Sequence, residues 1–206
     1  EKEYQHPDIK KIFCRANAAV AKYNRLRGRL GSKLDYWNFD LFSATAAFAV
    51  VKGNQVYWFS ICDSAVLHFK KNGKLSFKSP GGWETLKKNL PKDWLKNTEK
   101  ERKKILRSFY RNSVDNNGKP NGYGVVTGEK SAEKYLNCGV FSVEPGDVVM
   151  VITDGFENYI KLEAFKNLFL SWPRDLKSKL KKMTRQKSVE DPIGFGLERS
   201  IIAVKF

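Results

Sequence analysis

Apolar residues recur every three or four positions over residues 7–29, which places them on one face of a predicted helix. Gly28 and Gly31 are expected to end this helix. Residues 160–169 and 176–183 show the same spacing and predict two helices near the end of the chain. The stretch 83–110 is lysine-rich and helical in pattern, broken by Pro91, and 131–136 is predicted as a short helix.

Runs rich in β-branched, alanine and aromatic residues predict the strands. Residues 43–51 and 54–61 read as a hairpin, and 65–70 turns at Asn72-Gly73 into a second hairpin strand over 75–77. Two more strands are predicted over 148–152, after a turn at 144–147, and over 200–206. Hairpins followed by separated helices favour an α+β layered fold over a doubly wound parallel sheet.

The 206 residues, 41% of them hydrophobic, are enough for one well-packed domain over 1–206. Within it, 83–124 is interpreted as an insertion or flap. No window approaches about 18 consecutive apolar residues, and the first residues are charged, which is not typical of a signal peptide. A soluble, cytoplasmic protein with no membrane partner is therefore expected.

The net charge of +16 indicates attraction to polyanions or acidic partners. Its positive residues gather in 87–104 and 174–187, which also read as helices with solvated faces. That interpretation is favoured over a nucleic-acid patch, because interleaved aromatic residues and a DNA or RNA motif are missing. Nucleic acid is thus the less favoured partner, and the sequence carries no signal for an oligomeric state.

Two apolar runs each end near an aspartate. Residues 55–61 lead into Asp63, and residues 148–152 lead into Asp154, which Gly155 follows. A carboxylate at the end of a buried strand is held rigidly, and two of them can converge on one hard cation such as Mg²⁺ or Mn²⁺. The alternative is that each aspartate is a turn or helix-capping residue.

Four segments resemble the PP2C-type (PPM) family of metal-dependent protein phosphatases. These are the small-residue strand 43–47, the strand ending in Asp63-Ser64, the segment from 145 to Asp154-Gly155, and the terminal strand 198–204. Residues 111–112, 122–124 and 127–129 are similar to a segment of the shorter microbial or viral members.

This resemblance implies a four-layer αββα sandwich of two antiparallel sheets flanked by helices. It also implies hydrolysis of phosphoserine and phosphothreonine in phosphorylated protein substrates by water activated on two or more Mn²⁺ or Mg²⁺ ions. Asp154 would be a ligand of the central ion pair, and Gly155 would let the backbone come close. Asp63 would be a peripheral ligand.

The chain departs from the family pattern in several places. No Asp-Gly motif precedes the first helix, so either this chain is a fragment or that part is absent. Leu197 stands where an aspartate is expected, and the neighbouring Glu198 and the upstream Asp191 are the candidate replacements. Their alternatives are a surface carboxylate paired with Arg199 or a lysine, and a turn residue. Cys62 replaces the usual glycine.

These departures keep a second hypothesis open: a catalytically inactive pseudophosphatase that acts as a binding or regulatory module. Other enzyme classes lack support. No nucleophile elbow precedes a helix, and the glycines at 122, 124 and 128 lack the spacing of a P-loop. His68 is expected to be a sheet residue rather than a base.

Overall fold

The computed structural model describes residues 8–29 and 34–206. The chain divides into two compact units. The first comprises Glu1–Ala46, Phe59–Asp63 and Gly81–Cys138, and the second comprises Ala47–Trp58, Ser64–Pro80 and Gly139–Phe206. Compact units within one chain do not decide between one domain and two, so the single-domain interpretation stays a prediction, as does the role of 83–124.

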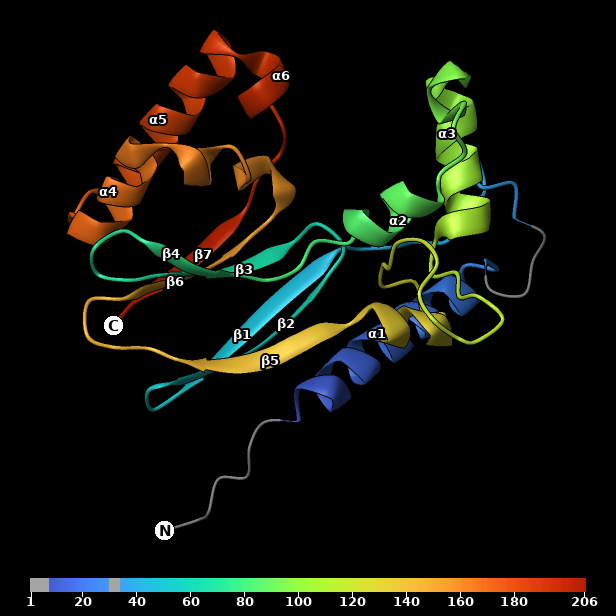
Figure 1. Ribbon diagram of the computed structural model, residues 1–206, viewed down its shortest axis with the longest axis horizontal. Coiled ribbons are helices and arrows are strands. Elements are labelled where there is room, and N and C mark those ends of the chain that lie inside the picture. The colour runs from blue at the N-terminus through green and yellow to red at the C-terminus, as the bar shows by residue number, and fades with distance from the viewer. Residues whose placement is uncertain (1–7, 30–33) are drawn as a thin grey trace. The chain divides into compact units, whose positions relative to one another are not determined.

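Helices dominate the first unit. They are α1 (Ile9–Leu26), α2 (Trp83–Asn89), a 3-10 turn (Trp94–Lys96), α3 (Glu99–Ile105) with a π-helical continuation (Leu106–Tyr110), and a 3-10 helix (Lys130–Tyr135) (Figure 1). The predicted first helix, the interruption near Pro91 and the short helix after residue 130 are confirmed. Pro7 and Gly31, at the predicted limits of the first helix, lie outside the described residues.

Two buried asparagines on α1 hold the first unit together. The Asn24 amide donates to the carbonyls of Phe42 and Thr127 at 2.9 and 2.8 Å, and its oxygen accepts from the Phe42 N–H. About two turns earlier, Asn17 donates to the Glu129 carbonyl and accepts from the Gly128 N–H. Each amide thus bonds backbone groups of other segments, among them the carbonyl of the buried Thr127.

The segment similar to the shorter family members forms part of this polar core. The Asn112 amide donates to Thr127 Oγ1 and Glu129 Oε2, both at 2.8 Å, and Arg111 pairs with Asp40 at 2.9 Å. Gly128 lies so close to α1 that an added Cβ would be 2.4 Å from the Ala21 Cα. Packing and hydrogen bonding therefore account for these motif residues. Similarity to the shorter microbial or viral members of the family stays a prediction.

Two antiparallel sheets carry the strands. One has the order β1-β2-β5, formed by Ala46–Lys52, Gln55–Ile61 and Asn137–Ser142. The other has the order β4-β3-β6-β7, formed by Leu75–Lys78, Ala65–Phe69, Val148–Ile152 and Ile201–Lys205. The predicted strands are confirmed, but β5 was not expected, because its Gly139 and short apolar run give little signal. Gly139 fits there because an added Cβ would lie 3.1 Å from the Trp58 ring.

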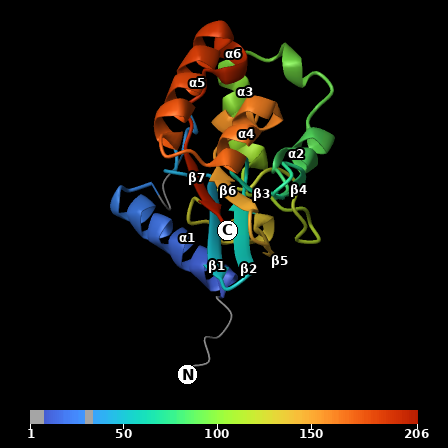
Figure 2. The same ribbon diagram turned by 90° about the vertical axis from the view of Figure 1, so that its left-hand side faces the viewer.

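Within the second unit the two sheets pack face to face. Their shared layer contains Val56, Trp58, Val66, Val143 and Val149. The opposite face of the β4-β3-β6-β7 sheet packs against α4 (Glu163–Ser171) and α5 (Leu176–Glu190), and α6 (Pro192–Phe195) follows α5 (Figures 1 and 2). Two antiparallel sheets with helices confirm the α+β class.

None of the helices in the described residues combines the length and the apolar character that crossing a bilayer would require.

Candidate metal site

The end of β6 is fixed to the start of β7. β6 and β7 pair antiparallel up to Ile152 and Ile201. Beyond this pair, the Thr153 N–H donates to the Ser200 carbonyl at 3.1 Å, and the Ser200 N–H donates to Thr153 Oγ1 at 2.9 Å. The Thr153 side chain thereby extends the pairing by one residue and fixes the turn that follows.

Asp154 begins that turn, in a single 3-10 turn over Asp154–Phe156. Its Oδ1 accepts from the Gly155 N–H at 2.8 Å, and its carbonyl accepts from the Glu157 N–H at 2.7 Å. The residue is exposed. Asp154 therefore takes part in the local turn, as the alternative interpretation expected, and still presents a carboxylate to solvent.

Gly155 brings this turn against the backbone of Glu198. A Cβ added at Gly155 would lie 2.2 Å from the Glu198 carbonyl oxygen and 2.8 Å from the Arg199 Cβ. Real Cβ atoms do not approach a carbonyl oxygen so closely, so only glycine fits without backbone movement. The predicted close approach at Gly155 is thus an approach to another segment of the protein. The segment that carries Asp154 and the segment that carries Glu198 lie next to each other.

The three residues near the position of the missing aspartate have different surroundings. Glu198 is exposed, and Leu197 exposes 55% of its surface. Asp191 is the N-cap of α6 and accepts from the Gly194 N–H at 2.9 Å. Asp191 therefore has the turn role given as its alternative, which leaves Glu198 as the carboxylate next to the Asp154 turn.

Arg199 secures the approach to β7. Its guanidinium donates to Ser188 Oγ at 2.7 Å and to the Leu197 carbonyl at 3.2 Å, and it also bonds the Phe195 carbonyl. It lies 5.3 Å from the centroid of the Tyr159 ring, a cation–π contact. The sequence suggested only a pairing with Glu198, because the bends of the chain after α5 have no periodic signal.

Asp63 belongs to the first unit, in the turn after β2. The preceding Cys62 has φ +67°, and its carbonyl accepts from the Gly82 N–H at 3.0 Å. A left-handed conformation is strained for a residue with a Cβ, which gives a physical reason for the glycine of the family pattern. The convergence of Asp63 with Asp154 stays a prediction.

The donor chemistry near β6 fits a hard divalent ion. Asp154 and Glu198 supply exposed carboxylates, and Mg²⁺ in particular is often held by one or two carboxylates while it keeps several waters. No cluster of three or more His, Cys, Asp or Glu side chains suited to a metal occurs in the part of the chain that the structure describes. Asp154 and Glu198 are therefore two exposed carboxylate residues near the end of β6, short of the three-residue cluster that would mark a metal site.

Solved structures similar to this one include serine/threonine phosphatases. The catalytic domain of the serine/threonine protein phosphatase PstP, in complex with two manganese ions, is 14% identical with a TM-score of 0.55, over 98% of this chain and 72% of that chain. The S. agalactiae serine/threonine phosphatase is 12% identical with a TM-score of 0.57, over 98% and 73%. A bacterial serine phosphatase is 11% identical with a TM-score of 0.56, over 98% and 70%.

These likenesses show a PP2C-like fold. The chain spans about half to three quarters of the lengths of the solved structures that it matches. No protein-family model matches the sequence, and no curated protein does.

Proposed function

We propose that this protein is a divalent-metal-dependent phosphatase that removes phosphate from phosphoserine or phosphothreonine in proteins. The observation that carries the proposal is the Asp154-Gly155 turn, fixed against the Glu198 backbone at the end of the inner strand β6. Asp154-Gly155 is also one of the four segments on which the family resemblance rests.

The metal would be Mn²⁺ or Mg²⁺. Asp154 and Glu198 would hold it, and Asp63 would be a peripheral ligand by the family resemblance. When bound, such an ion acts as a Lewis acid that activates water and neutralises charge on phosphoryl oxygens. The protein's own contribution is positional: Gly155 and Thr153 fix the turn that carries Asp154 at the end of β6.

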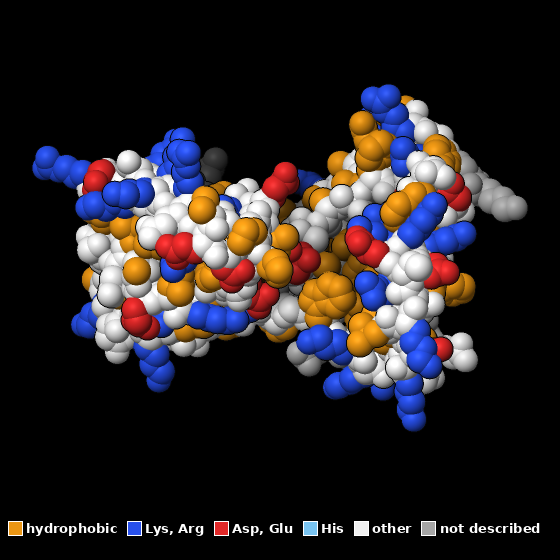
Figure 3. Space-filling view, turned by 90° about the horizontal axis from the view of Figure 1, so that it is seen from above, with side chains coloured by type: hydrophobic (Ala, Val, Ile, Leu, Met, Phe, Trp, Pro, Cys, Tyr) orange, Lys and Arg blue, Asp and Glu red, His pale blue; other side chains and the backbone are white. Residues whose placement is uncertain are grey.

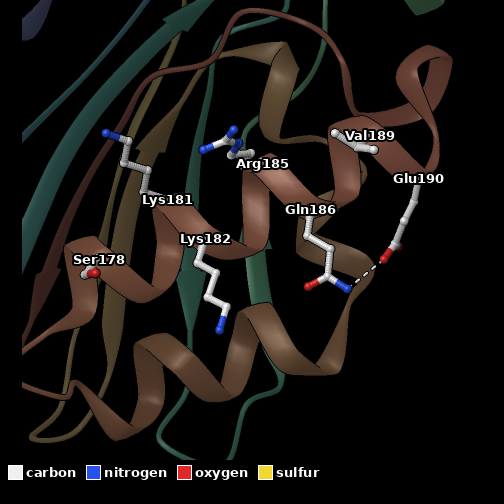
Figure 4. Close-up of a pocket in the computed structure, with 7 residues that line it drawn as sticks. All are labelled: Ser178, Lys181, Lys182, Arg185, Gln186, Val189 and Glu190. Atoms are coloured by element: carbon white, nitrogen blue, oxygen red, sulfur yellow. Dashed lines mark hydrogen bonds between the residues drawn. The ribbon is translucent and has the colours of Figure 1, made fainter.

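Positive surface charge supports an acidic, phosphorylated substrate. Lys181, Lys182 and Arg185 are exposed on α5 and line the surface hollow drawn in Figure 4. Lys and Arg side chains are also spread over the face seen in Figure 3, with Asp and Glu among them. Such a distribution attracts polyanions over a distance, in keeping with the net charge of +16.

The second candidate function is a pseudophosphatase that binds phosphorylated proteins without hydrolysing them. Leu197 favours it, because a half-exposed leucine stands where the family pattern has a carboxylate ligand. An enzyme and a pseudophosphatase share the fold and the basic surface, so only turnover separates them.

The test is phosphate release from matched peptides. The full-length native protein is incubated with peptides of one sequence carrying phosphoserine, phosphothreonine or phosphotyrosine, with Mn²⁺ and with a chelator. Release from the first two peptides that requires Mn²⁺ supports the phosphatase. Binding of these peptides with no release at any metal concentration supports the pseudophosphatase and overturns the enzyme.

A further inference from the structure

Ser76, His68 and Asp147 form a continuous chain of hydrogen bonds in the second unit, at the opposite end of β6 from Asp154. Ser76 Oγ lies 2.9 Å from His68 Nδ1, and His68 Nε2 lies 2.7 Å from Asp147 Oδ2. These are the contacts that join a hydroxyl nucleophile, a base and an orienting carboxylate.

The base and the carboxylate are buried, whereas the hydroxyl is not. His68 exposes 3% of its surface and Asp147 exposes none, while Ser76 is exposed on the edge strand β4. The His68 ring is stacked on Phe141, with centroids 4.8 Å apart and planes 6° apart. Packing therefore fixes the imidazole, and the serine bonded to it belongs to an exposed position of an edge strand.

Alternation along the strands explains how the buried pair meets. His68 on β3 and Asp147 just before β6 both face the layer between the sheets, on the same side as Val66 and Val149. Asp147 Oδ2 also accepts from Lys70 Nζ and from the Glu144 N–H, both at 3.1 Å. The Lys71 N–H donates to Asp147 Oδ1 at 3.2 Å. Four donors hold this carboxylate.

A bulge in β4 aims Ser76 at the imidazole. His68 pairs with Phe77 and Phe69 pairs with Leu75, so Ser76 is an extra residue between two registered pairs. An extra residue of this kind redirects its side chain, and such bulges are over-represented beside active sites. The serine is therefore presented by a bulge on an edge strand and not by a strand-to-helix elbow.

The hydrogen-bond pattern sets the tautomer. An ionised carboxylate only accepts, so His68 Nε2 must carry the proton that lies between it and Asp147. In the neutral imidazole Nδ1 is then an acceptor, and the Ser76 hydroxyl donates to it. The alternative acceptor of that hydroxyl, the His68 carbonyl oxygen, is farther away at 3.3 Å.

We propose that Ser76 is a nucleophile that reacts with small activated esters, with His68 as its general base and Asp147 as a positioning residue. The Ser76 Oγ–acyl carbon bond forms as the serine proton passes to His68 Nδ1. The ester C–O bond then breaks, and the departing alcohol takes that proton. Water, deprotonated by His68, hydrolyses the acyl-serine to a carboxylic acid and restores the hydroxyl.

This site needs no metal and is independent of the proposed phosphatase. The test therefore uses a fluorophosphonate probe on the full-length protein in a chelator, with the labelled residue located by mass spectrometry. Ser76 Oγ would displace fluoride from phosphorus and yield its proton to His68. Ser142, an exposed strand serine bonded to Gln55, is the matched control.

We expect label on Ser76 at a rate about 100-fold or more above that of Ser142, because general-base assistance gives about 10²–10⁴-fold. Ser76→Ala should abolish this label, whereas Ser142→Ala should leave it unchanged. Equal labelling of the two serines, or no label on Ser76, would overturn the proposal.

The pH profile tests His68 without a variant that threatens the fold. The wild-type labelling rate at Ser76 should level off as the pH rises, because a general base assists fully once it is unprotonated, while labelling at Ser142 keeps rising with hydroxide. The charged groups around the imidazole are its carboxylate partner Asp147, Lys70, which is paired with Asp147, and Glu144, which is paired with Lys70. A Ser76 profile parallel to that of Ser142 would show that the three residues are structural and would contradict the proposal.

Discussion

A Cβ added at Gly155 would lie 2.2 Å from the carbonyl oxygen of Glu198. This relationship makes the turn after β6 and the segment before β7 one structural unit, although 43 positions separate the two residues in the sequence. Asp154 directly precedes Gly155, so its segment lies next to the backbone of Glu198, an exposed residue that follows Leu197.

Gly155→Ala should lower the free energy of unfolding by about 1–3 kcal/mol, because the new methyl group forces apart two backbone segments in close contact. Chemical denaturation of the variant and the wild type measures the change. Gly81→Ala is the control, since an added Cβ there has no heavy atom within 4 Å. Equal losses in the two variants would contradict the close approach at Gly155.

Asn24→Ala should destabilise the first unit by about 1–3 kcal/mol, because it leaves backbone groups of Phe42 and of the buried Thr127 without partners. Thermal or denaturant unfolding measures this. Asn167→Ala, at an exposed position on α4, should have little effect by comparison. An Asn24 variant as stable as the wild type would show that the buried amide contributes nothing.

Asp147 should make stability depend on pH at the acid end. Burial raises the pKa of this carboxyl, but hydrogen bonds from His68, the Glu144 N–H and Lys70 outweigh it and bring the pKa below the ordinary value. A lowered pKa means that the stabilisation is complete above the unfolded pKa of about 3.9 and is lost as the pH falls through the folded value.

The measurement is the free energy of unfolding of the wild type and of Asp147→Asn between about pH 6 and pH 3. The advantage of the wild type should shrink toward the acid end, because the amide cannot ionise. A difference that stays constant over this range would disprove an ionised Asp147 in the folded protein.

The sequence predicted most of the second unit because its strands are apolar runs with clear turn residues, such as Asn72-Gly73 between β3 and β4. It missed β5, where Gly139 interrupts the run and is explained only by its contact with Trp58. Periodicity describes which face an element buries, so it finds long elements better than short ones that depend on tertiary neighbours.

The sequence predicted individual residues of the candidate site but not the contacts between them. Asp154-Gly155 was recognisable because it follows a buried strand, and Asp191 was recognisable as a turn residue before Pro192. The contacts of Thr153 with Ser200 and of Arg199 with Ser188 had no signal, because they join segments through hydrogen bonds that no local pattern encodes. His68 was correctly expected in a sheet, but its contacts with Ser76 and Asp147 depend on a bulge.

The most direct test of the central claim is Mn²⁺-dependent phosphate release from a phosphothreonine peptide by the full-length protein, compared with its Asp154→Asn variant. Asp93→Asn, another exposed aspartate, is the matched control. We expect the Asp154 variant to lose at least about 100-fold in rate, since the amide is a poorer ligand for a hard cation, while the Asp93 variant keeps the wild-type rate. Equal rates in all three proteins, or no release by the wild type at any Mn²⁺ concentration, would contradict a metal-dependent phosphatase centred on Asp154.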